Sequence, residues 1–157
     1  MKFDWIVDGV LAASPLPKSD ADIQALYNGG VRAILTLTET PITAQRRVSD
    51  DVGEQLGMTL KHIAIDDFHP PTPEQAEEAV AFIDEMAVEG KPVLVHCYAG
   101  QGRTGCILHS YFLMKGYSLP DTKDEVVLRR PICDFNGLSD VQKVFVEDFS
   151  QGRTINI

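Results

Sequence analysis

The chain has 157 residues and a mass of 17.3 kDa, a size that suits one domain able to bury its own core. Its 14 Lys and Arg residues against 23 Asp and Glu residues give a formal net charge of −9. This acidic balance argues against a general nucleic-acid or membrane-surface binder, which needs a basic face, but it permits a small local anion site.

Cysteine usage and the two termini indicate the compartment. The three cysteines, Cys97, Cys106 and Cys133, form no CxxC pair, which argues against a disulfide framework or a zinc site and favours reduced thiols in the cytoplasm. Acidic residues interrupt the N-terminus before an apolar run forms, so we expect no signal peptide. No segment approaches the roughly 18 apolar residues of a membrane span. We expect the polar C-terminus, residues 150–157, to be a loose tail.

Strand and helix patterns alternate along the chain. In chain order they predict a hairpin of residues 3–7 and 10–13, a helix capped by Ser19 and ending at residues 28–30, a strand at 31–37, a polar helix-compatible stretch at 43–56, a strand at 60–65, a helix from Thr72 to Gly90, a buried strand at 93–95, and helices at 104–115, 119–128 and 139–149. This alternation predicts an α/β fold with a central, mostly parallel sheet flanked by helices. We expect residues 1–157 to form one domain.

The segment 95–105, Val-His-Cys-Tyr-Ala-Gly-Gln-Gly-Arg-Thr-Gly, joins the buried strand to a buried helix. Glycine-containing joints of this kind point backbone N–H groups at an anion, and the helix dipole assists. The loop between Cys97 and Arg103 can surround one tetrahedral phosphate, with Arg103 donating two hydrogen bonds to it and Cys97 facing the phosphorus. The loop amides, the helix terminus and Arg103 together would stabilise a reactive thiolate.

The pattern His-Cys-x-x-Gly-x-x-Arg-Thr-Gly resembles the phosphate-binding loop of cysteine-dependent protein tyrosine phosphatases. The small size is similar to that of the compact, atypical dual-specificity members. Three further segments match in the same order, namely Leu37-Thr38-Glu39, Asp67-Phe68-His69-Pro70-Pro71 and Ser139-Asp140-Val141-Gln142. The resemblance covers residues 12–149 and implies a protein tyrosine phosphatase-like fold that works without a metal or cofactor.

The resemblance also implies a role for each matching loop residue. Cys97 matches the nucleophile that forms a phosphocysteine intermediate, Arg103 the residue that holds the phosphoryl group, and Thr104 the hydroxyl that helps the sulfur to leave. Thr104 could also be a helix N-cap. His96 matches a histidine that orients the loop, and a buried structural histidine describes it equally well. The residues expected to bind substrate are Tyr98, Ala99, Gly100, Gln101, Gly102 and Arg103.

The general acid must be a carboxylic acid on a movable loop, because the leaving oxygen has to be protonated as it departs. Asp66 and Asp67 are adjacent candidates that spacing alone does not separate. The family's Asp-Phe-x-Pro-Pro pattern maps onto Asp67, which would then act as a base toward water in the second step.

Two further residues have competing interpretations. Gln142 matches a family glutamine that positions the attacking water, but Ser139-x-x-Gln142 is also a helix capping box. Glu39 resembles an acidic residue that holds the loop arginine, and a solvated glutamate at a strand end explains it nearly as well.

We therefore expect a phosphatase of phosphorylated proteins or peptides, acting on phosphotyrosine and also on phosphoserine or phosphothreonine. The alternative keeps the loop but takes a phosphoinositide, inositol phosphate or RNA 5′-phosphate, with Lys61 as a local basic residue. The net charge of −9 and the neutral loop positions oppose a highly anionic substrate. A phosphopeptide-binding module without activity is disfavoured because nucleophile, acid and arginine are all present. A rhodanese-like sulfurtransferase is disfavoured because Arg-Thr-Gly follows the cysteine loop.

Overall fold

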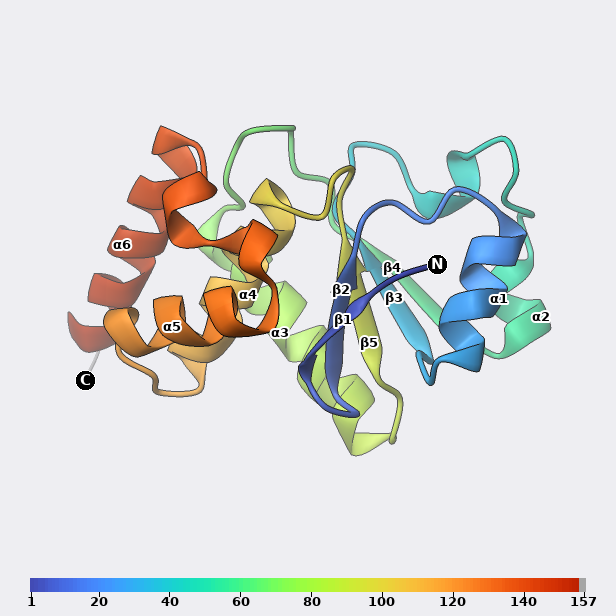
Figure 1. Ribbon diagram of the computed structural model, residues 1–157, viewed down its shortest axis with the longest axis horizontal. Coiled ribbons are helices and arrows are strands. Elements are labelled where there is room, and N and C mark those ends of the chain that lie inside the picture. The colour runs from blue at the N-terminus through green and yellow to red at the C-terminus, as the bar shows by residue number, and fades with distance from the viewer. Residues whose placement is uncertain (156–157) are drawn as a thin grey trace.

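The computed structural model describes residues 1–155, with side chains up to Gly152. Its centre is a five-stranded sheet with the order β1-β2-β5-β3-β4 (Figure 1). The strands are β1 Asp4–Val7, β2 Leu11–Ser14, β3 Ala33–Thr36, β4 Thr59–His62 and β5 Val93–His96. The β1–β2 hairpin is antiparallel and the other pairs are parallel, which confirms the predicted fold class. The fully buried β5 lies in the middle, where both faces are covered.

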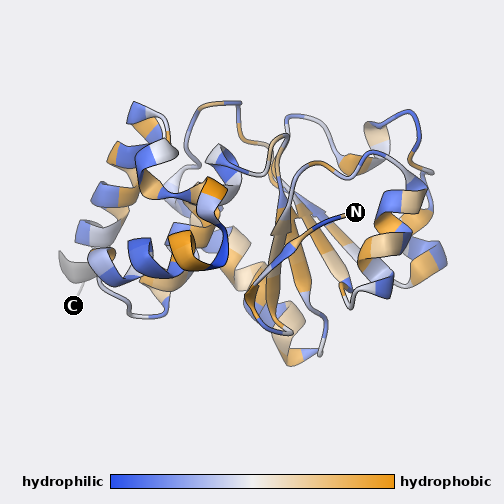
Figure 2. Ribbon diagram, in the orientation of Figure 1, coloured by the Kyte–Doolittle hydropathy of each residue, from blue (hydrophilic) through white to orange (hydrophobic). Residues whose placement is uncertain are grey.

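Helices cover both faces of the sheet (Figure 1). They are α1 Asp20–Asn28, α2 Val52–Leu56, α3 Pro73–Val88, α4 Gly102–Met114, α5 Leu119–Arg129 and α6 Asp140–Ile155, with short 3₁₀ turns at Ile42–Ala44, Pro131–Cys133 and Phe135–Gly137. The α1 and α2 helices pack on one face and α3 to α6 on the other. Apolar residues concentrate on the strands and on the inner helix surfaces, while polar residues face outward (Figure 2). Within the described residues, no helix is long and apolar enough to cross a membrane.

The predicted helix starts agree with the structure. The Ser19 side chain accepts a hydrogen bond from Asp22 N, which caps α1. Thr72 and Gln75 form the reciprocal hydrogen bonds of a capping box at the start of α3. These caps are local hydrogen bonds between residues three apart, so a sequence pattern is sufficient to predict them.

The polar stretch 43–56 is not the single helix that its composition allows. The segment between the first 3₁₀ turn and the short α2 helix is held against α1 by tertiary hydrogen bonds. Asp20 N donates to Arg47 O at 3.0 Å, and the Asp20 carboxylate accepts from both the backbone and the hydroxyl of Ser49. These bonds join residues 27 to 29 positions apart, and no local pattern reports them.

The C-terminus also differs from the expectation. Residues 150–155, expected to be a loose tail, continue α6 as far as Ile155, while residues 156 and 157 lie outside the described part of the chain. The side chains of Phe145, Val146 and Phe149 pack against α4 and hold α6 as far as Phe149. The polar residues that follow continue this packed helix, because adding a residue to an existing helix costs less than starting one.

The parallel strands bring their carboxyl ends to one edge of the sheet, at the top of Figure 1. The loop after β5 and the loop between β4 and α3 lie side by side at this edge. In open α/β sheets, ligands bind outside the carboxyl ends of the strands. The residues that the sequence singles out are therefore brought to the usual binding edge.

Candidate active site

Residues 97–103, called here the cysteine loop, comprise the connection after β5 and the first two residues of α4. Cys97 and Arg103 are 3% and 2% exposed, yet both reach a pocket of about 280 Å³ at the edge of the sheet. The pocket is lined by Asp67 and Phe68 from the loop between β4 and α3, by Cys97, Tyr98, Ala99, Gln101, Gly102 and Arg103 of the cysteine loop, and by Gly137, Ser139 and Gln142. The structure thus brings together the predicted nucleophile, arginine, acid and glutamine from separate segments of the chain.

The amides of the cysteine loop are oriented by bonds to its carbonyls. In a trans peptide the C=O and the next N–H point in opposite directions. Cys97 O accepts from His96 Nδ1 at 3.0 Å and Tyr98 O accepts from Leu16 N at 2.9 Å. These carbonyls are drawn away from the pocket, so the amides that follow them turn inward. Among the described residues, no backbone amide from Tyr98 to Arg103 donates to a protein acceptor. The loop is therefore a ring of free donors suited to a tetrahedral anion.

Arg103 is fixed at one end and open at the other. Its Nη1 donates to Glu39 Oε1 at 2.6 Å and to Ile65 O at 3.0 Å, and its Nη2 lies 3.3 Å from Asp67 Oδ1. Its Nε is buried without a partner among the described residues. The predicted Glu39–Arg103 contact is present, and the hydrogen bond from Arg103 contributes to lowering the pKa of Glu39, behind the larger effect of the glutamate's own backbone amide. The guanidinium thus offers Nε and Nη2 to an anion.

His96 is a neutral buried support for the loop. Burial lowers its pKa from 6.5 to about 4. Because Cys97 O can only accept, Nδ1 carries the ring proton, and Nε2 therefore accepts from the Thr36 hydroxyl at 2.8 Å. The ring links the β3 strand to the first peptide of the cysteine loop. This position suits the role expected from the sequence, in which His96 orients the cysteine loop.

Thr104 is placed to interact with the cysteine sulfur. Its hydroxyl donates to Cys97 Sγ at 3.2 Å. The expectation that Thr104 caps α4 is wrong, because the helix begins at Gly102 and Gln101 is the N-cap residue. Thr104 lies in the first turn, where its side chain is free to turn back toward the sulfur.

The two candidate acids differ in position. Residues 66–71 form a loop, called here the aspartate loop, which is exposed from Asp66 to His69. The Asp67 carboxylate lines the pocket and contacts Arg103, whereas Asp66 is exposed and is not among the lining residues. The backbone carbonyl of Asp66 instead accepts from His69 N at 3.0 Å, closing the turn. The geometry therefore favours Asp67, as the family pattern does.

Gln142 forms the capping box that the sequence allowed, and it also lines the pocket. Its Oε1 accepts from Ser139 N at 3.0 Å, and its backbone N donates to Ser139 Oγ at 3.3 Å, which is capping-box geometry. Its Nε2 donates to His69 O at 3.2 Å, and a Cβ on Gly102 would lie 2.9 Å from that nitrogen. One side chain thus caps α6, holds the aspartate loop and borders the cysteine loop.

Sequence reasoning missed three residues that hold these loops. Arg130 Nε and Cys133 Sγ both donate to Gly100 O, at 2.9 and 3.2 Å. Ser139 Oγ donates to Phe68 O at 2.8 Å, across 71 positions. The sequence indicates Ser139 as a cap and Cys133 as a free thiol, but no sequence signal relates either of them to a loop elsewhere in the chain.

Solved structures with this fold include phosphatases. Tk-PTP in its active form is 28% identical, with a TM-score of 0.78 over 99% of this chain and 97% of that chain. PTPMT1 in complex with PI(5)P shares the fold at 17% identity, with a TM-score of 0.81 over 98% and 97%. Human dual specificity protein phosphatase 12 is 34% identical over 123 residues, which make up 71% of this chain and 36% of the human protein. The chain thus spans little more than a third of that relative's length.

The family assignment follows from a further match. Residues 14–117, more than half of the chain, match the family model described as "Polymorphic toxin system, DSP-PTPase phosphatase". The chain belongs to this family, within the cysteine-dependent protein tyrosine phosphatase superfamily, which confirms the resemblance drawn from the cysteine loop. The matched range includes Glu39, Asp67, Cys97 and Arg103, while Gln142 and Arg130 lie beyond it.

Proposed function

We propose that the protein hydrolyses phosphomonoesters on proteins or peptides through a phosphocysteine intermediate. The observation that carries this proposal is the convergence on one pocket of a cysteine sulfur, a ring of unpartnered amides, and an arginine whose Nε is buried without a partner among the described residues. Such a constellation binds and polarises a single phosphoryl group. Family membership supports the same activity.

In the first step the Cys97 thiolate attacks phosphorus, and the bond from phosphorus to the leaving oxygen breaks. The inward amides and the Nε and Nη2 of Arg103 stabilise the charge on the three equatorial oxygens. A phosphate that binds Nη2 competes with Asp67 for that nitrogen, which frees the carboxyl to protonate the leaving oxygen.

In the second step water attacks the phosphocysteine, and Asp67 accepts a proton from it. The Thr104 hydroxyl, already 3.2 Å from Cys97 Sγ, stabilises the departing thiolate. Gln142 borders the loop and supplies an amide that can orient the water. The products are inorganic phosphate and the regenerated thiolate.

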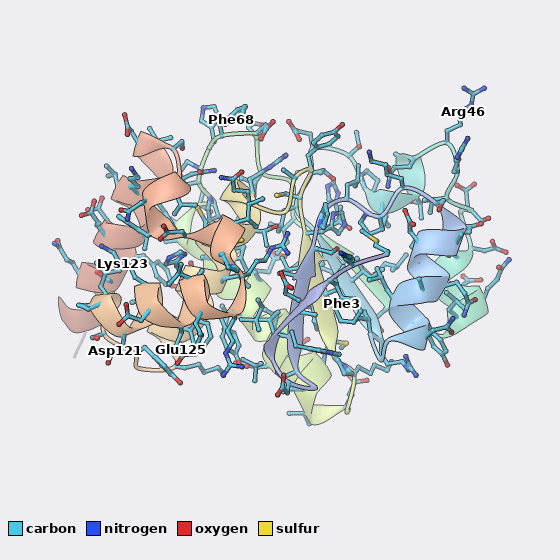
Figure 3. All side chains as sticks on the ribbon, in the orientation of Figure 1. Phe3, Arg46, Phe68, Asp121, Lys123 and Glu125 are labelled. Atoms are coloured by element: carbon cyan, nitrogen blue, oxygen red, sulfur yellow. The ribbon has the colours of Figure 1, made fainter. Side chains whose placement is uncertain are left out.

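The surroundings of the pocket favour a substrate with one phosphate on a neutral or weakly acidic carrier. The variable positions of the cysteine loop that line the pocket, Tyr98, Ala99 and Gln101, are uncharged, and the protein carries a net charge of −9. Phe68, 71% exposed, stands at the rim of this edge (Figure 3), and Tyr98 is 62% exposed. Two exposed aromatic rings beside a phosphate site suit an aryl phosphate such as phosphotyrosine.

The test is turnover of p-nitrophenyl phosphate and of a phosphotyrosine peptide by wild type and by Cys97→Ser. Loss of the sulfur should lower kcat by about 10³-fold or more, while inorganic phosphate still binds. Cys106→Ser, which changes a buried thiol outside the pocket, is the matched control. Full activity of Cys97→Ser would refute the mechanism.

The runner-up substrate class is a phosphoinositide or another polyanion, and a fold neighbour bound to PI(5)P is the observation in its favour. Lys61, the basic residue suggested by the sequence, pairs with Glu78 at 3.1 Å and does not line the pocket. A panel of phosphotyrosine peptide, phosphoserine peptide and inositol lipids separates the two classes. We expect the phosphotyrosine peptide to have the highest kcat/KM, and a preference for the lipids would reverse the assignment.

A further inference from the structure

Gly100 lies at the back of the cysteine loop, on the side away from the pocket. Its carbonyl accepts two hydrogen bonds, from Arg130 Nε at 2.9 Å and from Cys133 Sγ at 3.2 Å. Arg130 follows α5 and is 6% exposed, and its Nη1 donates to Asp4 Oδ2 of β1 at 2.7 Å. The loop is thus held from behind by residues far from it in the sequence.

These two bonds determine the direction of an amide inside the pocket. Because the peptide is planar and trans, a Gly100 carbonyl that points back toward Arg130 makes the Gln101 N–H point forward, toward the anion position. Gly100 has a φ of +70°, and a Cβ there would lie 2.5 Å from both Arg130 Nη2 and Ser14 O. A glycine backbone can rotate easily. The peptide that follows it therefore needs an external restraint to keep its N–H inward.

The chemistry of the restraint suits a fixed orientation. Burial raises the pKa of Cys133 to about 12, so its thiol keeps the proton that it donates to Gly100 O. A buried guanidinium is costly unless it is paired, and a packing role alone would be met by an apolar side chain. Arg130 is instead paired with Asp4 and aimed at one carbonyl.

We propose that Arg130, oriented by Asp4 and assisted by Cys133, is a positioning residue that holds the Gly100–Gln101 peptide so that its amide binds the phosphoryl group. This inference rests on the proposed function. Its consequence is that losing Arg130 weakens binding of phosphate itself, and does so in proportion to the loss of catalysis, because the same amide contacts the phosphoryl oxygens in the ground and transition states.

The test compares Arg130→Gln, Arg130→Lys and Asp4→Asn with Arg129→Lys, a control at the neighbouring position, where the side chain is exposed and pairs with Glu125. We expect Arg130→Gln to raise the inhibition constant for inorganic phosphate and the KM for p-nitrophenyl phosphate by about tenfold. Arg130→Lys should be almost as weak, because it keeps a charge for Asp4 but loses Nε. Asp4→Asn should have a smaller effect, and Arg129→Lys none.

A direct measurement separates positioning from general destabilisation. In wild type the ¹⁵N–¹H signal of Gln101 should shift on saturation with phosphate, and in Arg130→Gln this shift should be lost while those of Tyr98 and Ala99 remain. A full Gln101 shift with unchanged phosphate inhibition in folded Arg130→Gln would overturn the inference. The proposed function is tested separately, and it fails if wild type does not hydrolyse phosphomonoesters or if Cys97→Ser keeps its activity. The phosphate titration is independent of that result, because it requires no turnover.

Discussion

The cysteine loop is anchored in the core of the protein, whereas the aspartate loop is anchored at its surface. The anchors of the cysteine loop are buried, from His96 below Cys97 to Arg130 behind Gly100. The aspartate loop is held by more exposed polar contacts, in which Ser139 binds Phe68 O and Gln142 binds His69 O. Its candidate acid, Asp67, is 53% exposed in its side chain, and Phe68 adopts a φ of +64°, unusual for a residue with a side chain.

This difference matches the tasks that we propose for the two loops. A phosphate cradle gains from amides that are fixed before the substrate arrives, because no binding energy is then used to order them. A proton donor must approach the leaving oxygen and later release product, so its loop gains from anchors that break at low cost. The strained backbone of Phe68 is consistent with a segment that has a second conformation.

The strongest test of the fixed cysteine loop is Arg103→Lys. Lysine keeps the positive charge but cannot present Nε and Nη2 together while Nη1 holds Glu39 and Ile65 O. We expect kcat/KM for p-nitrophenyl phosphate to fall by about 10³-fold. Steady-state kinetics with wild type measure the loss, and near-normal activity would show that a charge alone suffices and that the fork geometry is unimportant.

The aspartate loop is tested by the pair of variants Asp67→Asn and Asp66→Asn. The first should lower kcat by about 10²-fold, because no acid then faces the leaving group, and the second by less than about threefold. The loss in Asp67→Asn should grow as the leaving group becomes more basic, from p-nitrophenyl phosphate to phenyl phosphate. If Asp66→Asn has the larger effect, the assignment of the acid is wrong.

Lowering the pH should reduce the stability of the fold through its buried histidines. Burial lowers the pKa values of His96 and His109 from 6.5 to about 4, so the unfolded chain binds more protons than the folded chain between these two values. Stability therefore falls as the pH drops through this window, by about 2 kcal/mol per histidine at about pH 5, or roughly thirtyfold in the unfolding constant. Urea unfolding at neutral and at mildly acidic pH measures it. His109→Phe should lose less stability on acidification than wild type, and an equal loss would contradict the shift.

The smallest effect should come from the anchor of the aspartate loop. Ser139→Ala removes the bond to Phe68 O and the cap of Gln142 N, and we expect kcat to fall about threefold to tenfold. Ser118→Ala is the matched control, since Ser118 caps α5 and does not line the pocket. Both variants should lose about 1 kcal/mol of stability. Equal activities in the two variants would show that Ser139 acts only as a cap.

The sequence by itself determined the class of fold, and it singled out residues that the structure brings to one pocket. Alternating patterns predicted the sheet and most helices, local caps predicted the starts of α1 and α3, and the spacing from His96 to Gly105 predicted the strand, loop and helix that form the cradle. These features depend on residues close together in the chain, so the pattern contains the information.

Only the tertiary structure decided how the site is held. Contacts across tens of residues decide which aspartate lines the pocket and which way the Gly100 carbonyl points. They also decide that the Gln142 side chain bonds both to the start of α6 and to the aspartate loop. Arg130 and Asp4 are ordinary charged residues in the sequence, 126 positions apart, and they become a partly buried pair behind the cradle only when α5 packs against β1. Long-range pairing of this kind depends on how the elements pack, and no local spacing encodes it.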